Sequence, residues 1–349
     1  MDAGLEPEAG GLEAGVRQEL GYLDLHCAGE PFRLLTEPMD LPGATMEERR
    51  RYVGRELGGL RRLALCEPRG HSNMYGGIMC PPVRPASDLG IVFLTTEGTS
   101  TMCGHGTLCL GRAAVELGLR EFCEGWNTLR VDAPSATVDV GVEVAGGEVR
   151  QVAFVNDRSF ACEGDFWLDG GLRGRVGVQV AYGGAFMVFV RASELGVDLE
   201  SARVGELLEL AGPLYEAASR LDVAHPEDGD KSIRRNGCCL ILASEPVVCG
   251  RRVRTRTFTM FGRGLYDRSP TGTGSSALAA LLVRDGVLGL GGVLENRGPS
   301  GIPFEVQVGP AADGRGGIVP TVCGQAFVTG RGTLVLEGAD PLQEGLSLL

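Results

Sequence analysis

A short glycine-rich module occurs twice in this sequence of 349 residues. Residues 103–118 align without a gap with residues 271–286, and the copies share Gly104/Gly272, Gly106/Gly274 and Gly118/Gly286. In each copy a glycine-rich turn opens a predicted helix and a glycine ends it, so the first backbone N–H groups of the helix are free to bind a ligand. The offset between the copies is close to half of the chain. We therefore expect two lobes whose helix N-termini face each other and form an anion pocket.

The composition is that of a soluble globular protein. Hydrophobic residues make up 43% of the chain and charged residues 22%, which is enough apolar content for a large core. No apolar run approaches the roughly 18 residues of a membrane span, and residues 1–18 resemble a flexible acidic tail rather than a signal peptide. Cysteines without regular spacing predict a reducing compartment, so we expect the cytoplasm.

The net charge of −12 argues against nucleic acid or an anionic membrane surface as partner, because either would need a basic patch. We therefore expect a small-molecule substrate. We expect the chain to form a homodimer.

The residues predict neither a cofactor nor a metal site. Lys231, the single lysine, lies in an acidic stretch and is poorly placed for a pyridoxal phosphate Schiff base. Residues 272–277 match the dinucleotide pattern G-x-G-x-x-A, but Pro270 interrupts the strand that should precede them. Cys103 and His105 alone supply too few ligands for zinc.

Strand-like segments dominate both halves, with one central helix in each. The local predictions are a capped helix from Thr45 to about Leu65, a hairpin of residues 138–144 and 148–155, a helix over 199–221 that breaks at Gly212-Pro213, and a β-meander over 304–336.

Cys103 is the strongest candidate for chemistry. Because it precedes the first turn of a helix, the helix dipole and free N–H groups should lower the pKa of its thiol from about 8.5 towards neutrality. Most other cysteines, among them Cys109 and Cys239, are expected to be buried structural thiols. Glu30 and His71 stand near turns and are expected to be ordinary polar loop residues.

Four ordered motifs resemble the proline racemase superfamily. They are HCAGEP at 26–31, RGHSNMYG at 69–76, STMCGHGT at 100–107 and DRSPTGTG at 267–274. The resemblance covers nearly the whole chain after about Gly21, and the ordered set is highly specific. It implies the diaminopimelate-epimerase-like α+β fold: two pseudo-symmetric lobes, each a curved sheet around a central helix.

With that fold the chain divides into four segments. These are a flexible tail (1–18), a first lobe with the Cys103 module (19–157), a second lobe with the Thr271 module (158–324) and C-terminal strands that return to the first lobe (325–349).

The resemblance further implies a cofactor-independent site in the cleft between the lobes. Carried over residue by residue, it assigns proton transfer to Cys103, carboxylate binding to the backbone of Gly104-His105 and Gly272-Thr273, contact with the substrate ring nitrogen to Asp267, and aromatic walls to Tyr75 and Phe261.

Thr271 is the informative departure, because racemases and epimerases of the superfamily have a second cysteine there. A Cys103/Thr271 pair instead resembles the branch that dehydrates trans-3-hydroxy-L-proline to Δ1-pyrroline-2-carboxylate, a hydro-lyase reaction with a cysteine as general base. Cys27 and Asn73 also depart from the usual Thr and Asp.

Two alternatives stay open at this stage. One is a proline or hydroxyproline racemase or epimerase, and the other is a non-catalytic amino-acid-binding protein.

Overall fold

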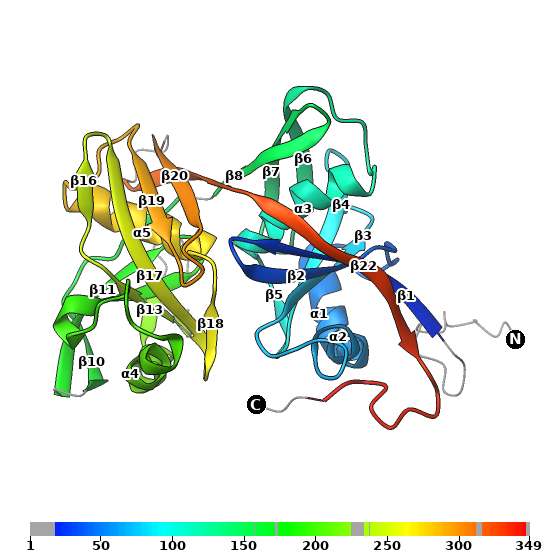
Figure 1. Cartoon of the computed structure of the whole chain (residues 1–349), viewed down its shortest axis with the longest axis horizontal. Coiled ribbons are helices and arrows are strands. Elements are labelled where there is room, and N and C mark those ends of the chain that lie inside the picture. The colour runs from blue at the N-terminus through cyan, green and yellow to red at the C-terminus, as the bar shows by residue number, and fades with distance from the viewer. Residues whose placement is uncertain are drawn as a thin grey trace, which may run out of the picture.

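The computed structural model describes residues 18–156, 158–171, 174–224, 234–236, 238–311 and 316–346. Within these ranges the chain forms two lobes, each a curved sheet around one long helix (Figure 1). Apart from Gln18, where the first strand begins, the predicted tail lies outside the described residues, as does Lys231. The segment boundaries near 157 and 324 stay predictions.

The first lobe is built around α3. Its elements are β1 (Gln18–Cys27), β2 (Glu30–Leu35), α1 (Met46–Glu56), α2 (Gly58–Leu65), β3 (Tyr75–Cys80), β4 (Leu89–Thr95), β5 (Thr99–Ser100), α3 (Gly104–Glu116), β6 (Gly125–Asp132), β7 (Thr137–Ala145) and β8 (Glu148–Val155).

The second lobe is built around α5. Its elements are β9 (Phe160–Ala161), β10 (Phe166–Gly171), β11 (Gly174–Tyr182), β12 (Phe186–Arg191), the short 3-10 helix η1 (Ala192–Leu195), α4 (Val204–Ala218), β13 (Asp222–Ala224), β14 (Arg234–Asn236), β15 (Cys239–Ala243), β16 (Val247–Cys249), β17 (Arg252–Gly262), β18 (Leu265–Asp267), α5 (Gly272–Arg284), β19 (Val293–Arg297), β20 (Pro303–Pro310) and β21 (Ile318–Gly324). The last strand, β22 (Ala326–Leu336), belongs to the first-lobe sheet.

Strand pairing follows the same order in both lobes. Along β1-β2-β3-β4-β6-β7-β8 the pairs are antiparallel, parallel, antiparallel, parallel, antiparallel and antiparallel. The series β11-β12-β15-β17-β19-β20-β21 repeats this order. The repeated sequence module is therefore part of a repeated topology, and the prediction of two similar lobes is confirmed.

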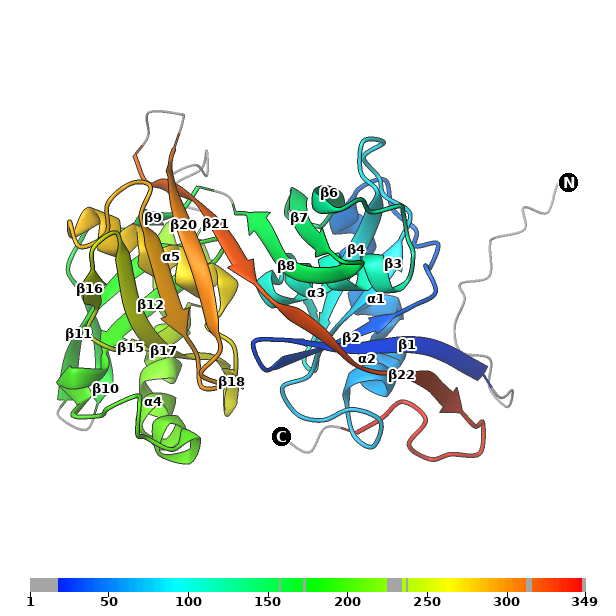
Figure 2. The ribbon, with the colours of Figure 1, turned by 45° about the horizontal axis from the view of Figure 1, so that its top comes forward.

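Strand pairing joins the two lobes. β8 and β21, the last strand of each series, pair antiparallel at the joint (Figure 2). Beyond them the chain crosses over: β9 pairs with β11 of the second lobe, and β22 pairs with β1 of the first. β22 thus follows the second-lobe strands in the sequence but lies in the sheet of the first lobe, which fixes the lobes against each other.

The two central helices are apolar on nearly every side, as expected for helices enclosed by a sheet. In α3 the buried residues include Leu108, Leu110 and Ala113, and α5 buries Leu278 and Leu281. These side chains belong to one continuous core that spans both lobes. No helix among the described residues is long and apolar enough to span a membrane.

Most local predictions hold, with three corrections. Thr45 caps α1 by accepting the Glu48 N–H, although the Glu48 carboxylate accepts the Ala44 N–H instead of that of Thr45. Gly146-Gly147 turns the predicted hairpin. The predicted β-meander over 304–336 is incomplete, because β20 pairs with β21 whereas β22 pairs with β1 of the first lobe. The helix predicted to about Leu65 is divided in two at Leu57. The predicted break at Gly212-Pro213 is wrong: α4 continues through Pro213, because Ala211 and Leu214 pack into the core of the second lobe and outweigh the lost hydrogen bond.

Gly111 provides a test of how tightly α3 packs. A Cβ atom at this position would lie 2.5 Å from Cγ1 of Val152 and 3.1 Å from Cγ2 of Val142. We expect Gly111→Ala to lower the free energy of unfolding by about 1–3 kcal/mol through overpacking. The control is Gly54→Ala on the exposed side of α1, whose Cβ would meet its nearest neighbour at 3.7 Å. That variant should be at least as stable as wild type. Denaturant titration that finds equal stabilities would contradict this packing.

Candidate active site

The N-termini of α3 and α5 meet at the centre of the molecule. A Cβ atom on Gly104 would lie 3.1 Å from Cα of Gly272, so the contact requires glycine. Cys103 is the N-cap residue of α3 and Thr271 that of α5, and neither side chain caps its own helix. The free N–H groups of both helices therefore face one place, where they favour a bound anion.

A cavity of about 170 Å³ lies at these two helix ends. Its first-lobe wall consists of Tyr75 and residues 100–105. The second-lobe wall includes Gly184 and Ala185, one face of the β12-β15-β17-β18 sheet (Met187, Cys239, Thr259, Phe261 and Asp267), and residues 271–273.

The structure brings all of the predicted site residues together at this cavity: Tyr75, Cys103, Gly104, His105, Phe261, Asp267, Thr271, Gly272 and Thr273. Their chemical roles stay predictions. Met187, Thr259 and Cys239 were missed, because nothing in the sequence marks the inner face of these strands at the cavity. Cys239 was expected to be a structural thiol, whereas it lines the cavity.

Aromatic rings from both lobes line one side of the cavity. The Tyr75 ring meets His105 edge to face at 4.7 Å and 87°, and Phe261 at 5.4 Å and 69°. Phe261 comes from the second lobe, so this contact also joins the lobes. The rings shield the cavity from water, and charges inside it therefore interact strongly.

The expected lowering of the Cys103 pKa is wrong for this structure. Burial raises the pKa of the Cys103 thiol far above its ordinary value, and the charges of Asp267 and Glu30 add to the rise. The nearby Gly106 N–H lowers the pKa of Cys103 but does not offset burial. The His105 ring lies 3.5 Å from Cys103 Sγ, and burial lowers the pKa of His105, so its imidazole is neutral at pH 7.

Thr271 is held in a backbone conformation that is unfavourable for a β-branched residue, with φ of 60°. Three hydrogen bonds hold this backbone conformation. Its hydroxyl donates to Asp267 Oδ2 at 2.8 Å, its N–H donates to Ser269 Oγ at 3.1 Å, and the Ser269 N–H donates to Asp267 Oδ1 at 2.7 Å. The Thr271 hydroxyl is therefore a hydrogen-bond donor to the Asp267 carboxylate.

A buried polar network supports this turn from below. Asn296, which is fully buried, donates to Ser275 Oγ at 2.9 Å and to the Pro270 carbonyl at 3.3 Å. The Ser275 hydroxyl also donates to the Pro270 carbonyl, at 2.8 Å. The N-terminus of α5 is thereby held rigidly to the β19 strand.

Glu30 is a fully buried side chain that bridges the lobes, so its expected role as a loop residue is wrong. Its Oε2 accepts the backbone N–H of Arg268 at 2.7 Å, next to Asp267. The same β1-β2 turn accepts a hydrogen bond from Ser300 Oγ at the Ala28 carbonyl, 2.6 Å away. His71, by contrast, is exposed as expected.

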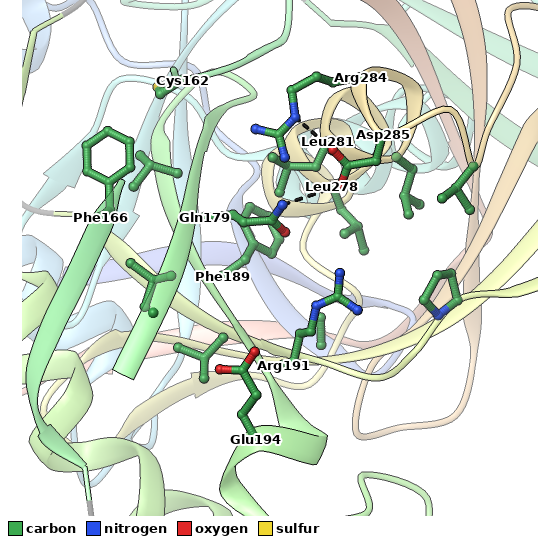
Figure 3. A pocket seen from close by; sticks show the side chains of 18 of the residues that line it. Cys162, Phe166, Gln179, Phe189, Arg191, Glu194, Leu278, Leu281, Arg284 and Asp285 are labelled. Carbon is green, nitrogen blue, oxygen red and sulfur yellow. Dashed lines mark hydrogen bonds and ion pairs between the residues drawn. The ribbon is translucent and has the colours of Figure 1, made fainter. Parts of the chain in front are cut away.

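The described residues contain no cluster of three or more His, Cys, Asp or Glu side chains that could hold a metal ion. A larger cavity of about 420 Å³ lies in the second lobe at the other end of α5, beside Arg284 and Asp285 (Figure 3). Four of its charged side chains form the ion pairs Arg284–Asp285 and Arg191–Glu245. Since it contains none of the predicted site residues, we assign the candidate active site to the smaller cavity.

This chain belongs to the proline racemase family, because residues 22–347 match the family model for proline racemase. The trans-L-3-hydroxyproline dehydratase of Bos taurus is 35% identical over 339 residues, which cover 94% of each chain. The 3-hydroxyproline 2-epimerase of Burkholderia multivorans is 32% identical, and the match covers 95% of this chain and 98% of that protein.

Solved structures confirm the predicted diaminopimelate-epimerase-like fold class. A hydroxyproline epimerase from Agrobacterium vitis, solved with bound trans-4-hydroxy-L-proline, superposes with a TM-score of 0.82 at 26% identity and covers 95% of both chains. The relatives thus include both dehydratases and epimerases, and family membership alone does not choose between the two reactions.

The raised pKa of Cys103 predicts a pH dependence. A thiol whose pKa lies above the ordinary value of 9.0 is protonated at neutral pH, and its thiolate fraction grows as pH rises towards the raised pKa. We expect the difference in ultraviolet thiolate absorbance between wild type and Cys103→Ser to be absent at pH 7 and to remain close to zero at pH 9. The subtraction removes the signal of the other cysteines. A full thiolate signal at pH 7 would contradict the effect of burial.

Proposed function

We propose that this protein is a hydro-lyase that removes water from trans-3-hydroxy-L-proline, giving an enamine that tautomerises to Δ1-pyrroline-2-carboxylate. The unequal pair of N-cap residues carries the proposal. Cys103 supplies a thiol at the N-terminus of α3, whereas Thr271 supplies a hydroxyl that donates to Asp267. A hydroxyl so bound cannot act as a base at neutral pH, so the pair contains one candidate for proton transfer at carbon.

The surroundings of the cavity favour an amino acid with a ring nitrogen. The substrate carboxylate would lie at the N-termini of α3 and α5, whose N–H groups would stabilise the negative charge that develops there when the α-proton leaves. The ring ammonium would lie at Asp267, which is buried. Tyr75 and Phe261 would cover the ring and exclude water.

One sulfur atom is enough for this elimination. In the trans isomer the hydroxyl lies opposite the carboxylate, and therefore on the same ring face as the α-hydrogen. The Cys103 thiolate would take the α-proton, the C–H electron pair would form the C=C bond, and the C–O bond would break. The new thiol would then protonate the departing hydroxyl, which leaves as water and returns Cys103 to the thiolate.

Substrate charge would help to form that thiolate. The charge of Asp267 is one cause of the raised Cys103 pKa. A substrate ammonium paired with Asp267 would neutralise this charge and lower the pKa of Cys103 in the complex. The base would therefore be activated by the substrate that it acts on.

Turnover in deuterated water tests the proposal. We expect wild type to convert trans-3-hydroxy-L-proline to Δ1-pyrroline-2-carboxylate, and the Cys103→Ser variant to remain folded with activity below detection, since a hydroxyl is far too weak an acid to replace the thiol. Chromatography detects the product, and NMR detects any deuterium at Cα of the recovered hydroxyproline.

The other functions give different results in the same experiment. Deuterium at Cα with inversion and without pyrroline carboxylate would identify an epimerase. Binding with neither exchange nor turnover would identify an amino-acid-binding protein. Either result would overturn the hydro-lyase proposal.

Thr271→Cys tests why the reaction is an elimination. The substitution is small and would place a second thiol opposite Cys103. We expect this variant to gain measurable epimerisation of L-proline or a hydroxyproline, followed by optical rotation, because a site with two thiols can take a proton from one face and return it to the other. The control is wild type, which should not invert L-proline. Inversion by wild type would show that Thr271 does not determine the reaction class.

A further inference from the structure

Thr259 lines the active-site cavity with a hydroxyl that has no hydrogen-bond partner among the described residues. The residue is 1% exposed and lies on β17. Its Oγ1 atom forms no hydrogen bond to any part of the chain that the structure describes. Burying a hydroxyl without a partner is unfavourable, so such a group at a cavity wall points to a ligand.

The neighbours of Thr259 on the same strand make this group unusual. Thr255, Thr257 and Thr259 alternate along one face of β17. The Thr255 hydroxyl donates to Asn296 Oδ1 at 2.9 Å, and Thr257 Oγ1 accepts from Asn296 Nδ2 at 2.9 Å. Asn296 therefore forms hydrogen bonds with the hydroxyls of Thr255 and Thr257. The Thr259 hydroxyl, at the cavity, is not part of this network.

Strand register places Thr259 beside Asp267. The two residues are direct partners across the antiparallel β17-β18 pair, so their side chains are neighbours on one face, and both line the cavity. The two oxygens of Asp267 already accept the Ser269 N–H and the Thr271 hydroxyl. A ligand cation at Asp267 would consequently lie within reach of a second, unoccupied acceptor.

We propose that the Thr259 hydroxyl accepts one N–H of the substrate ring ammonium while Asp267 accepts the other. The inference rests on the proposed substrate class, a pyrrolidine-2-carboxylate. The nitrogen of such a ring carries two N–H bonds when protonated, and Asp267 and Thr259 provide two adjacent acceptors. The pair makes the site selective for a saturated secondary amine over a ring whose nitrogen carries one N–H.

Two ligands and two variants test this selectivity. L-proline has two N–H bonds and no leaving hydroxyl, whereas pyrrole-2-carboxylate has one N–H. Calorimetry on the full chain should show that Thr259→Val raises the Kd for L-proline about tenfold or more, the loss expected for a hydrogen bond to a charged group, and changes the Kd for pyrrole-2-carboxylate by less than about twofold. Valine retains the shape of threonine, so packing is preserved.

Thr137→Val is the matched control. Thr137 on β7 also has a buried hydroxyl without a partner among the described residues, but it does not line the active-site cavity. This variant should leave both dissociation constants unchanged. Equal weakening of both ligands by Thr259→Val, no weakening of L-proline, or failure of wild type to bind L-proline would each overturn the inference.

The test is independent of turnover. A wild type that binds L-proline but does not dehydrate trans-3-hydroxy-L-proline contradicts the proposed function and leaves the Thr259 measurement valid. A wild type that dehydrates this substrate, with L-proline affinity unaffected by Thr259→Val, contradicts the inference alone.

Discussion

The close approach of two helix N-termini at Gly104 and Gly272 is the constraint on which the site depends. A Cβ atom on either glycine would lie 3.1 to 3.3 Å from Cα of the other, so a side chain at this contact would force the helices apart. The approach brings the positive ends of two helix dipoles to one cavity. The return of β22 to the first-lobe sheet and the β8-β21 pair hold this arrangement.

A symmetric scaffold here supports an asymmetric site. The strand order and the central helix repeat, yet Cys103 and His105 in the first lobe correspond to Thr271 and Thr273 in the second. The first lobe supplies the Cys103 thiol at its helix N-terminus, and the second supplies the Thr271 hydroxyl and the Asp267 carboxylate. In the proposed function, proton transfer at carbon and recognition of the ring nitrogen lie on opposite sides of one cavity.

Enclosure determines the electrostatics of the cavity. The same burial that excludes water also disfavours a free thiolate, because desolvation outweighs the stabilisation that the helix N-terminus gives to Cys103. Asp267 and Glu30 place further negative charge nearby. A zwitterionic ligand suits such a site, since its carboxylate matches the helix ends and its ammonium neutralises Asp267.

The sequence by itself determined the repeated module, the family, the fold class and the motif residues that meet at the cavity, because glycine turns, caps and catalytic motifs depend on local chain chemistry. It did not predict the continuation of α4 through Pro213, the bridge made by Glu30, or the roles of Cys239 and Thr259 as cavity walls. Each of these depends on which strands become neighbours. The Cys103 pKa had the wrong expected direction for the same reason: the helix dipole is a local property, whereas burial follows from the meeting of two lobes, and only tertiary structure decides that.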